Sequence, residues 1–366
     1  MNKRIVFVVN HDLVIYNFRK EIVEALLMEK YEVFIISPPG TRIKILEEMG
    51  CYYYPVHINR HGLNPFSDLK FLLNIKKIIK EIDPLVVLTF TIKPNIYGGI
   101  VSSYLGIPYL VNITGLGTSM QEKGIVKNIV DRLYKFSMRK VNRIFFQNEH
   151  DLNYFENSNI SSSEKYALIP GSGVNLNHFS LQEYPNSNSI KFIFISRLMK
   201  EKGFDLYLEA AKYIKKRYPE TEFHICGFAE QNYSNQIESL IQDNTIIYHG
   251  MVMDIRNILK DIHCTVHPTY YPEGISNVLL ESAACGKPLI TTDRPGCREV
   301  VDEGVNGFLI LENDLNSLIE ALIKFIKLSH LERKQLGLNG RKKVVRQFDR
   351  QVVVRKYMEE ISKISR

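Results

Sequence analysis

Short runs of apolar residues alternate with longer amphipathic stretches from one end of this 366-residue chain to the other. The short runs are nearly continuous in apolar residues, which is typical of parallel strands that helices cover on both faces. The sequence therefore predicts an α/β fold with doubly wound parallel sheets. The predicted strands are RIVFVV, YEVFIIS, LVVLTF, YLVNI and RIFFQN in the first half, and KFIFIS, EFHIC, TIIYHG, CTVHP and PLITT in the second.

The longest polar break lies in NISSSEKYALIPGSGVNLNHFSLQEYPNSNS, where Ser, Asn, Pro and Gly collect. A chain of this length is expected to form two domains, each with its own core. Each half opens with a strand that leads into a polar loop and a helix, so we expect two Rossmann-like domains that face one another across a cleft. The expected boundaries are 1–172 for an N-terminal domain, 173–345 for a C-terminal domain and 346–366 for a closing helix that can pack back on the N-terminal domain.

Cysteine content and hydropathy indicate the compartment in which the protein is expected to work. The five cysteines show no C-x-x-C spacing and most lie in apolar segments, which favours a reducing cytoplasm. No stretch has the length and apolar content of a signal peptide or a membrane span, so we expect a soluble or peripheral protein.

The net charge of +7 is concentrated in one segment. Residues 118–143 carry seven basic and two acidic side chains, and no nucleic-acid-binding motif accompanies them. We expect this segment to meet an anionic membrane surface; the alternative is an ordinary solvated helix face. Its apolar residues at helical spacing are expected to face the domain core; they are Ile125, Ile129, Leu133 and Phe136.

The segment PEGISNVLLESAACGKP follows the predicted strand CTVHP and combines a turn with a helix start. Gly274 permits a close turn, and Ser276 or Asn277 is a good N-cap. The backbone N–H groups of 274–276 and the helix dipole would then form a phosphate site. Carboxylates repel phosphate, so Glu273 and Glu281 are expected to bind neutral hydroxyl groups, as on a sugar and a ribose. Alternatively, Glu273 is a surface loop residue and Glu281 pairs with a buried basic side chain.

The segment ISRLMKEKGFD places two basic residues after the first strand of the second half. Arg197 offers a planar fork and Lys202 a point charge, a combination suited to a diphosphate. Their charge would stabilise a diphosphate that leaves during a reaction. Taken alone, they are also compatible with ordinary loop positions.

Two other motifs do not support a cofactor. TGLGTSM begins like a dinucleotide-binding loop, but Met120 occupies the third glycine position. His263 and His267 share one face of a predicted strand without a carboxylate companion, and no Asp-x-Asp occurs. We therefore expect no metal and no other cofactor.

Together these motifs resemble the retaining glycosyltransferases of family four, which have the GT-B fold. The resemblance rests on SRLMKEKG and on PEGISNVLLESAACGKPLITTDRPGCREVVDEGVNGFLI. The first half also resembles members that act on bacterial polyprenyl-diphosphate-linked sugars, through NFRKEIVEALL, HGLNPFSDL, TIKPNIYGG and NITGLGTSM.

The resemblance implies a role for each matching residue. Arg197 and Lys202 would hold the donor diphosphate, Glu273 would contact the transferred sugar, and these three are the expected catalytic residues. Glu281 would bind the ribose. Further donor-binding residues are expected at Gly227, Phe228, Val252 and Met253, beside a uracil, and at Gly274, Ile275, Ser276 and Asn277.

On the acceptor side, many family members place a histidine in the loop that here reads Asn112-Ile113-Thr114-Gly115. His11, after the first strand, is a substitute candidate. The full set of expected acceptor-side residues is His11, Lys93, Asn95, Thr114 and Gly115.

The expected function is transfer of a hexose or N-acetylhexosamine from a UDP-sugar to a lipid-diphosphate-linked sugar, with retention of anomeric configuration and without metal. The expected setting is bacterial surface polysaccharide or glycan assembly at the inner face of the cell membrane, without nucleic acid. A nucleotide-sugar epimerase or a transferase for a soluble acceptor is an alternative on the same fold. An inactive nucleotide-sugar-binding scaffold is an alternative of another class.

Overall fold

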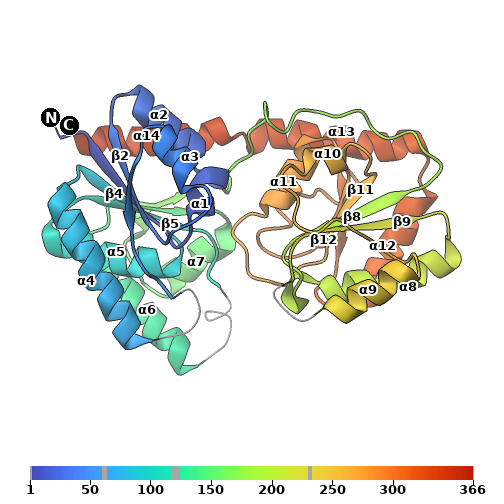
Figure 1. Ribbon diagram of the computed structural model, residues 1–366, viewed down its shortest axis with the longest axis horizontal. Coiled ribbons are helices and arrows are strands. Elements are labelled where there is room, and N and C mark those ends of the chain that lie inside the picture. The colour runs from blue at the N-terminus through green and yellow to red at the C-terminus, as the bar shows by residue number, and fades with distance from the viewer. Residues whose placement is uncertain (1, 60–63, 118–123, 230–232, 366) are drawn as a thin grey trace. The chain divides into compact units, whose positions relative to one another are not determined.

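A computed structural model describes residues 2–59, 64–117, 124–229 and 233–365 (Figure 1). The chain divides into two compact units. Unit 1 comprises Met1–Gly173 together with Arg350–Arg366, and unit 2 comprises Val174–Asp349. Within the described ranges, no helix is both long and apolar enough to cross a membrane.

Unit 1 contains a parallel sheet in the order β3-β2-β1-β4-β5-β6-β7. The central strand β1 pairs with β2 through Phe7 and Ile35, and with β4 through Phe7 and Leu88. The order reverses between β1 and β4, which makes the carboxyl ends of these strands the expected binding edge. The strands are β1 Arg4–Val8, β2 Glu32–Ser37, β3 Tyr52–Pro55, β4 Val86–Phe90, β5 Tyr109–Ile113, β6 Arg143–Phe146 and β7 Tyr166–Leu168.

Helices cover both faces of this sheet, and each face has its own apolar core. Figure 1 shows α4, α5 and α6 along one side of the sheet and α2 and α14 along the other. The helices of the first side are α4 Pro65–Ile82, α5 Ile92–Leu105, α6 Ile125–Ser137 and α7 Glu149–Asn157. Those of the second side are α1 Asp12–Phe18, α2 Lys20–Met28, α3 Ile43–Glu48 and α14 Arg350–Ser365.

The last helix, α14, belongs to unit 1 although it follows unit 2 in sequence. Arg350 at its start is buried and forms an ion pair with Glu21 of α2 (Nη1 to Oε2, 2.9 Å). Its guanidinium also donates to the Gly173 carbonyl, at the end of the first crossing between units. Gly173 has a φ of +64°, and a Cβ there would lie 2.5 Å from the Arg350 Cα, so only glycine fits this contact.

Unit 2 contains a second parallel sheet in the order β10-β9-β8-β11-β12-β13, which reverses between β8 and β11. The strands are β8 Lys191–Ile195, β9 Glu222–Cys226, β10 Ile247–Tyr248, β11 Cys264–His267, β12 Leu289–Thr292 and β13 Gly307–Ile310. The helices are α8 Phe204–Arg217, α9 Ser234–Gln242, α10 Arg256–Leu259, α11 Asn277–Ala284, α12 Leu315–Lys327 and α13 His330–Gln347. Two apolar clusters cover the two faces of the sheet.

All ten predicted strands are present, and the described part of the chain contains three further strands that were not predicted. β3 consists of YYYP and β7 of YAL, both at an edge of the first sheet, where short strands carry little apolar signal. β13 is the edge strand GFLI.

The orientation of α6 differs from the sequence expectation. Val130 and Tyr134 are buried against the unit 1 core, whereas Ile129 and Phe136 are 40% and 50% exposed. Leu133 is partly buried against the core, and the Ile125 side chain lies outside the described residues. α6 packs tightly on α5, because a Cβ at Gly99 would lie 2.8 Å from the Ser137 carbonyl oxygen. This close contact fixes the face that α6 turns inward, and the prediction that Ile129 and Phe136 face the core is wrong.

Candidate active site

The candidate site of unit 2 lies at the carboxyl ends of β8 and β11, where the strand order reverses. Two segments meet there, 196–203 after β8 and 268–276 after β11. Gly203 has a φ of +76°, and a Cβ at this position would lie 2.1 Å from the Pro268 carbonyl oxygen. The glycine therefore lets the two segments approach closely enough for their side chains to meet.

The side chains of Lys202 and Glu273 form an ion pair across these two segments. Lys202 ends a short 3-10 helix, Lys200–Lys202, and is 8% exposed. The Lys202 ammonium has three N–H donors, so it can bind Glu273 and a further acceptor at the same time. The sequence predicted both residues for the site but did not predict that they pair with one another.

Tyr271 brings the two basic residues together. The Arg197 guanidinium carbon lies 5.4 Å from the centre of the Tyr271 ring, and the Lys202 Nζ lies 4.7 Å from it. Both cations are therefore attracted to the same aromatic ring. Tyr271 was not among the predicted site residues, although its position two residues before Glu273 was the available signal.

His267, the last residue of β11, is also part of the site. It is 1% exposed, and its Nε2 lies 3.4 Å from Glu273 Oε1 and 3.2 Å from the Ser276 hydroxyl. The prediction that His267 lacks a carboxylate neighbour is wrong, because the turn after β11 folds Glu273 back over the end of the strand. His263 lies before β11, and its Nδ1 accepts the backbone N–H of Lys191 (3.2 Å).

The pKa of Glu273 reflects competing effects. Burial by itself raises it, but the Lys202 ammonium and the His267 hydrogen bond outweigh burial and hold the pKa well below its usual range. Glu273 is therefore an anion at neutral pH.

The turn before α11 differs from the expected phosphate site in one respect. The backbone N–H of Ser276 donates to the Gly296 carbonyl (2.8 Å), so it does not point to a ligand. Gly296 has a φ of +90°, and a Cβ there would lie 2.4 Å from the Gly274 carbonyl oxygen, so the two loops are in tight contact. Of the residues predicted to bind a phosphate at this turn, Ser276 is therefore the one whose N–H is directed to the protein backbone.

Two predicted donor-binding side chains lie on α11. Asn277 begins the helix, and its buried Oδ1 has no hydrogen-bond partner within the described parts of the chain. Glu281 lies one turn further along and is half-buried. Both are on the same short helix, which holds them at a fixed spacing.

The predicted nucleobase residues lie after β9 and β10. Gly227 has a φ of +151°, and a Cβ there would lie 1.7 Å from the Ser196 carbonyl oxygen, so the end of β9 passes directly beside the segment that carries Arg197. Its N–H donates to the Gly250 carbonyl (2.8 Å), which draws in the segment with Val252 and Met253. Phe228 and Met253 are 46% and 74% exposed, leaving apolar surface beside the candidate site.

The predicted acceptor-side residues of unit 1 lie near the carboxyl edge of its own sheet. His11 caps α1, accepts the Leu13 N–H (3.2 Å) and lies beside the buried Asp12. Lys93, in the first turn of α5, donates to Asp68 of α4 (2.7 Å). Thr114 and Gly115 follow β5 and are partly exposed.

Two asparagines of unit 1 support the backbone from below the surface. Asn95 is 1% exposed and donates to the Asn112 carbonyl (2.9 Å), so its amide supports the end of β5, and its contact with an acceptor stays a prediction. Asn112, the first residue of the segment 112–115 in which a histidine was expected from the resemblance, is fully buried and donates to the Tyr357 hydroxyl of α14 (2.7 Å). Asn112 therefore has a structural role that links β5 to α14.

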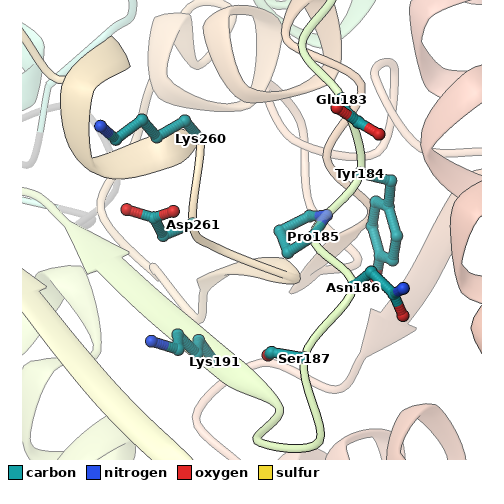
Figure 2. A pocket seen from close by; sticks show the side chains of 8 residues that line it. All are labelled: Glu183, Tyr184, Pro185, Asn186, Ser187, Lys191, Lys260 and Asp261. Carbon is teal, nitrogen blue, oxygen red and sulfur yellow. The ribbon is translucent and has the colours of Figure 1, made fainter.

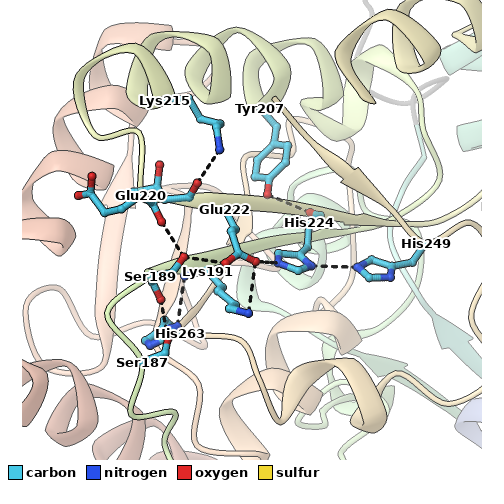
Figure 3. Close-up of polar contacts among 11 residues, drawn as sticks. Ser187, Ser189, Lys191, Tyr207, Lys215, Glu220, Glu222, His224, His249 and His263 are labelled. Carbon is cyan, nitrogen blue, oxygen red and sulfur yellow. Dashed lines mark hydrogen bonds and ion pairs between the residues drawn. The ribbon is translucent and has the colours of Figure 1, made fainter. Parts of the chain in front are cut away.

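Another polar cluster of unit 2 lies along β9 (Figure 3). Glu222 binds Lys191 (3.3 Å) and His224 (3.1 Å), and His224 in turn contacts His249 (2.9 Å). Burial lowers the pKa of both histidines. Within the described ranges, no group of three or more His, Cys, Asp or Glu side chains is arranged to hold a metal ion.

A pocket of about 520 Å³ lies at the opposite edge of the unit 2 sheet. Lys191, the first residue of β8, lines it together with Asp261, which precedes β11 (Figure 2). Figure 2 shows residues 183–187, which precede β8, along its other side. Because it opens at the amino ends of the strands, it is separate from the candidate site.

Comparisons with known proteins agree with this architecture. Residues 179–343 match the family model of glycosyl transferases group 1, and residues 4–148 match the model glycosyl transferase 4-like. The fold and these matches define a glycosyltransferase. The chain belongs to the glycosyltransferases with the GT-B fold, with a group 1 domain in unit 2 and a 4-like domain in unit 1.

Two curated relatives extend over most of the chain. The N,N'-diacetylbacillosaminyl-diphospho-undecaprenol alpha-1,3-N-acetylgalactosaminyltransferase of Campylobacter jejuni is 26% identical, with 97% of each chain covered. The UDP-Gal:alpha-D-GlcNAc-diphosphoundecaprenol alpha-1,3-galactosyltransferase of Escherichia coli is 28% identical, covering 82% of this chain and 81% of the relative.

Solved structures show the same fold at lower identity. A glycosyltransferase from Rickettsia africae has a TM-score of 0.80 at 21% identity and covers all of both chains. Anabaena HepE in complex with UDP and glucose has a TM-score of 0.80 at 18% identity, covering 99% of this chain and 100% of that one.

Proposed function

We propose that this glycosyltransferase moves a hexose or N-acetylhexosamine from a UDP-sugar to a sugar on a lipid diphosphate, in the assembly of a bacterial surface polysaccharide or glycan. The observation that carries the proposal is the grouping of Arg197, Lys202 and Glu273 around Tyr271 at the switch point of unit 2. The names of the two curated relatives support the acceptor class, since both act on sugars linked to a diphosphate lipid. The HepE complex supports UDP as the nucleotide.

In the proposed reaction, Arg197 and Lys202 bind the donor diphosphate. The bond between the sugar C1 and the phosphate oxygen breaks, and negative charge grows on the departing UDP, where the two cations stabilise it. The anionic Glu273 holds Lys202 and contacts hydroxyl groups of the transferred sugar. Glu281 and Asn277 bind the ribose side of the donor, and Phe228, Val252 and Met253 lie beside the uracil.

The acceptor hydroxyl attacks C1 from the face that UDP leaves, which retains the anomeric configuration. Its proton passes to the departing phosphate oxygen, so bond making and proton transfer balance without an enzymic nucleophile. The acceptor is placed by unit 1 through His11, Lys93, Thr114 and Gly115. The reaction is proposed to take place in the cytoplasm, at the inner face of the cell membrane, with α6 close to the lipid.

The test is release of UDP from candidate UDP-sugars, measured with and without a lipid-diphosphate-linked sugar. Arg197→Ala is expected to lower turnover about a hundredfold, because Arg197 meets charge that grows in the transition state. Lys200→Ala is the matched control, since Lys200 is exposed in the same segment and is assigned no contact with the donor. UDP release that does not depend on the acceptor, or a change below about fivefold in Arg197→Ala, contradicts the proposal.

A further inference from the structure

Helix α4 of unit 1 presents an apolar stripe on its outer face. Phe66, Leu69 and Leu73 are 87%, 54% and 54% exposed, and they lie within one side of the helix at spacings of three and four residues. The opposite side of α4 packs on the sheet through its buried apolar residues, which are Phe71, Ile75, Ile79 and Ile82. The stripe is therefore not needed for the core of unit 1.

Helix α6 adds exposed apolar residues on the same layer. α4, α5 and α6 lie on one side of the unit 1 sheet (Figure 1), and α5 packs against both of the others. Val126, Ile129 and Phe136 of α6 are 44%, 40% and 50% exposed. We call the outer faces of α4 and α6, with these residues and the α4 stripe, the α4–α6 face.

The exposed charges of the α4–α6 face are almost all positive. Its exposed basic residues are Lys70, Lys77 and Lys80 of α4, Arg132 and Lys135 of α6, and Arg139 directly after α6. The acidic residues of the same helices are mostly neutralised, since Asp68 is buried against Lys93 and Asp131 binds Lys127 (3.0 Å). Within the described parts of α4 and α6, Glu81 is the exposed acidic residue, and it lies beside Lys80 in the last turn of α4.

The position of this face relates it to the proposed acceptor site. The strands are parallel, so α4, α5 and α6 each begin near the carboxyl edge of the sheet and lead back to its amino edge. His11, Lys93 and Thr114 lie at that carboxyl edge. The stripe occupies the first half of α4, and therefore the part of the helix nearest to these residues.

We infer that the α4–α6 face binds an anionic lipid bilayer, with Phe66, Leu69 and Leu73 inserted among the acyl chains. Basic residues around an apolar stripe match the surface of such a bilayer, where head groups are negative and the layer beneath is apolar. A second copy of this chain does not fit, because a two-fold contact would place the same positive residues against each other. The inference rests on the proposed function, since a lipid-linked acceptor is what the bilayer would deliver to this edge.

Membrane binding through inserted apolar side chains responds to salt differently from binding by charge alone. Electrostatic attraction is screened over about 10 Å at moderate ionic strength, whereas the transfer of apolar side chains into lipid is not screened. Wild-type protein is therefore expected to keep part of its vesicle binding at high salt.

Flotation with vesicles of phosphatidylethanolamine and phosphatidylglycerol tests the face. The triple variant Phe66→Ser, Leu69→Ser, Leu73→Ser is expected to bind at least about tenfold more weakly, because three inserted apolar side chains are lost. The control triple variant is Met28→Ser, Tyr213→Ser, Leu331→Ser, whose side chains are 83%, 48% and 74% exposed on other helices. The control is expected to float like wild type. Thermal unfolding of each protein confirms that the variants fold.

Turnover with two acceptors separates this inference from the proposed function. A water-soluble, short-chain acceptor should be glycosylated equally by wild type and by the α4 variant, while the lipid acceptor in vesicles should be glycosylated more slowly by the variant. Absence of turnover with either acceptor, combined with the expected flotation, contradicts the proposed function alone. Wild-type protein that does not float, an α4 variant that floats like wild type, or a wild-type dimer that the α4 substitutions dissociate overturns the membrane assignment.

Discussion

The Nε2 atom of His267 lies 3.4 Å from Oε1 of Glu273, at the end of β11 and below the turn that carries Tyr271. This contact links a buried strand to the carboxylate that is proposed to meet the transferred sugar. His267 Nδ1 is buried and has no hydrogen-bond partner within the described residues, which favours the tautomer that carries its proton on Nε2. In this tautomer, His267 can donate to Glu273 and fix the direction of its carboxylate.

His267→Gln should retain most turnover, because the glutamine Nε2 can replace the imidazole donor, whereas His267→Leu should lower kcat roughly tenfold through loss of a hydrogen bond to a charged group. KM for the donor should change much less than kcat. His263→Asn, before the same strand, is the control and should leave kcat unchanged. Equal loss of activity in the Gln and Leu variants would show that His267 acts only through packing.

The Lys202–Glu273 ion pair should contribute to folding as well as to catalysis. Lys202→Met and Glu273→Gln should each lower the free energy of unfolding by about 3 kcal/mol, because removal of one partner leaves the other buried without its counter-charge. The double variant should recover much of this loss while it stays inactive. Urea unfolding followed by circular dichroism measures the effect. Additive losses in the double variant would contradict a direct pairing.

Glu281 and Glu273 should differ in their effects on the reaction. Glu281→Gln should weaken UDP binding by about 1 to 2 kcal/mol through loss of a charged hydrogen bond, with a smaller effect on turnover. Glu273→Gln should mainly lower turnover, since its contact is with the reacting sugar. Calorimetric titration with UDP and turnover at saturating donor separate the two. The same loss of UDP affinity in both variants, with turnover unchanged, would reject this division of roles.

The stability of the protein should fall as the pH drops below 6.5. Burial, reinforced by nearby Arg333 and Lys287, lowers the pKa of His263 from 6.5 to about 4. The folded state therefore binds this proton at a lower pH than the unfolded chain does. The stabilisation that comes from neutral His263 is fully present above pH 6.5 and is lost toward pH 4. The loss amounts to about 3 kcal/mol for this residue.

His263→Asn tests this pH dependence, because it keeps an acceptor for the Lys191 N–H but does not titrate. Its unfolding free energy should fall less steeply between pH 6.5 and 4 than that of the wild type. His224 and His249, whose pKa values burial also lowers, account for a residual slope in the same direction. A variant with the wild-type slope would show that His263 is not the group responsible.

Turnover should continue in excess EDTA. Arg197 and Lys202 already supply positive charge at the expected diphosphate position, and neither side chain is a ligand for a divalent cation. The assay compares initial rates with and without chelator, followed by addition of magnesium or manganese. Loss of activity in EDTA with recovery on adding metal would mean that the two side chains are insufficient.

The sequence by itself determined the class of fold and the segments that carry the predicted donor-site residues. Continuous apolar runs identify strands buried on both faces, and the two segments SRLMKEKG and PEGISNVLLE carry the residues that meet at the switch point of unit 2. These features are local, because strand propensity, helix start and stop signals, and loops after strands are all encoded by residues near one another in the chain. The short edge strands β3 and β7 escaped detection because they contribute few buried residues.

Tertiary structure decided the contacts between segments distant in sequence. It brought His267 and Lys202 into contact with Glu273 and paired the Ser276 N–H with the Gly296 carbonyl. It also buried Asn95 behind the edge of the first sheet. It also turned Phe136 outward. Periodicity identifies an apolar side of a helix, but packing against a neighbour selects the side that is buried, and in α6 the close contact between Gly99 and Ser137 makes that selection.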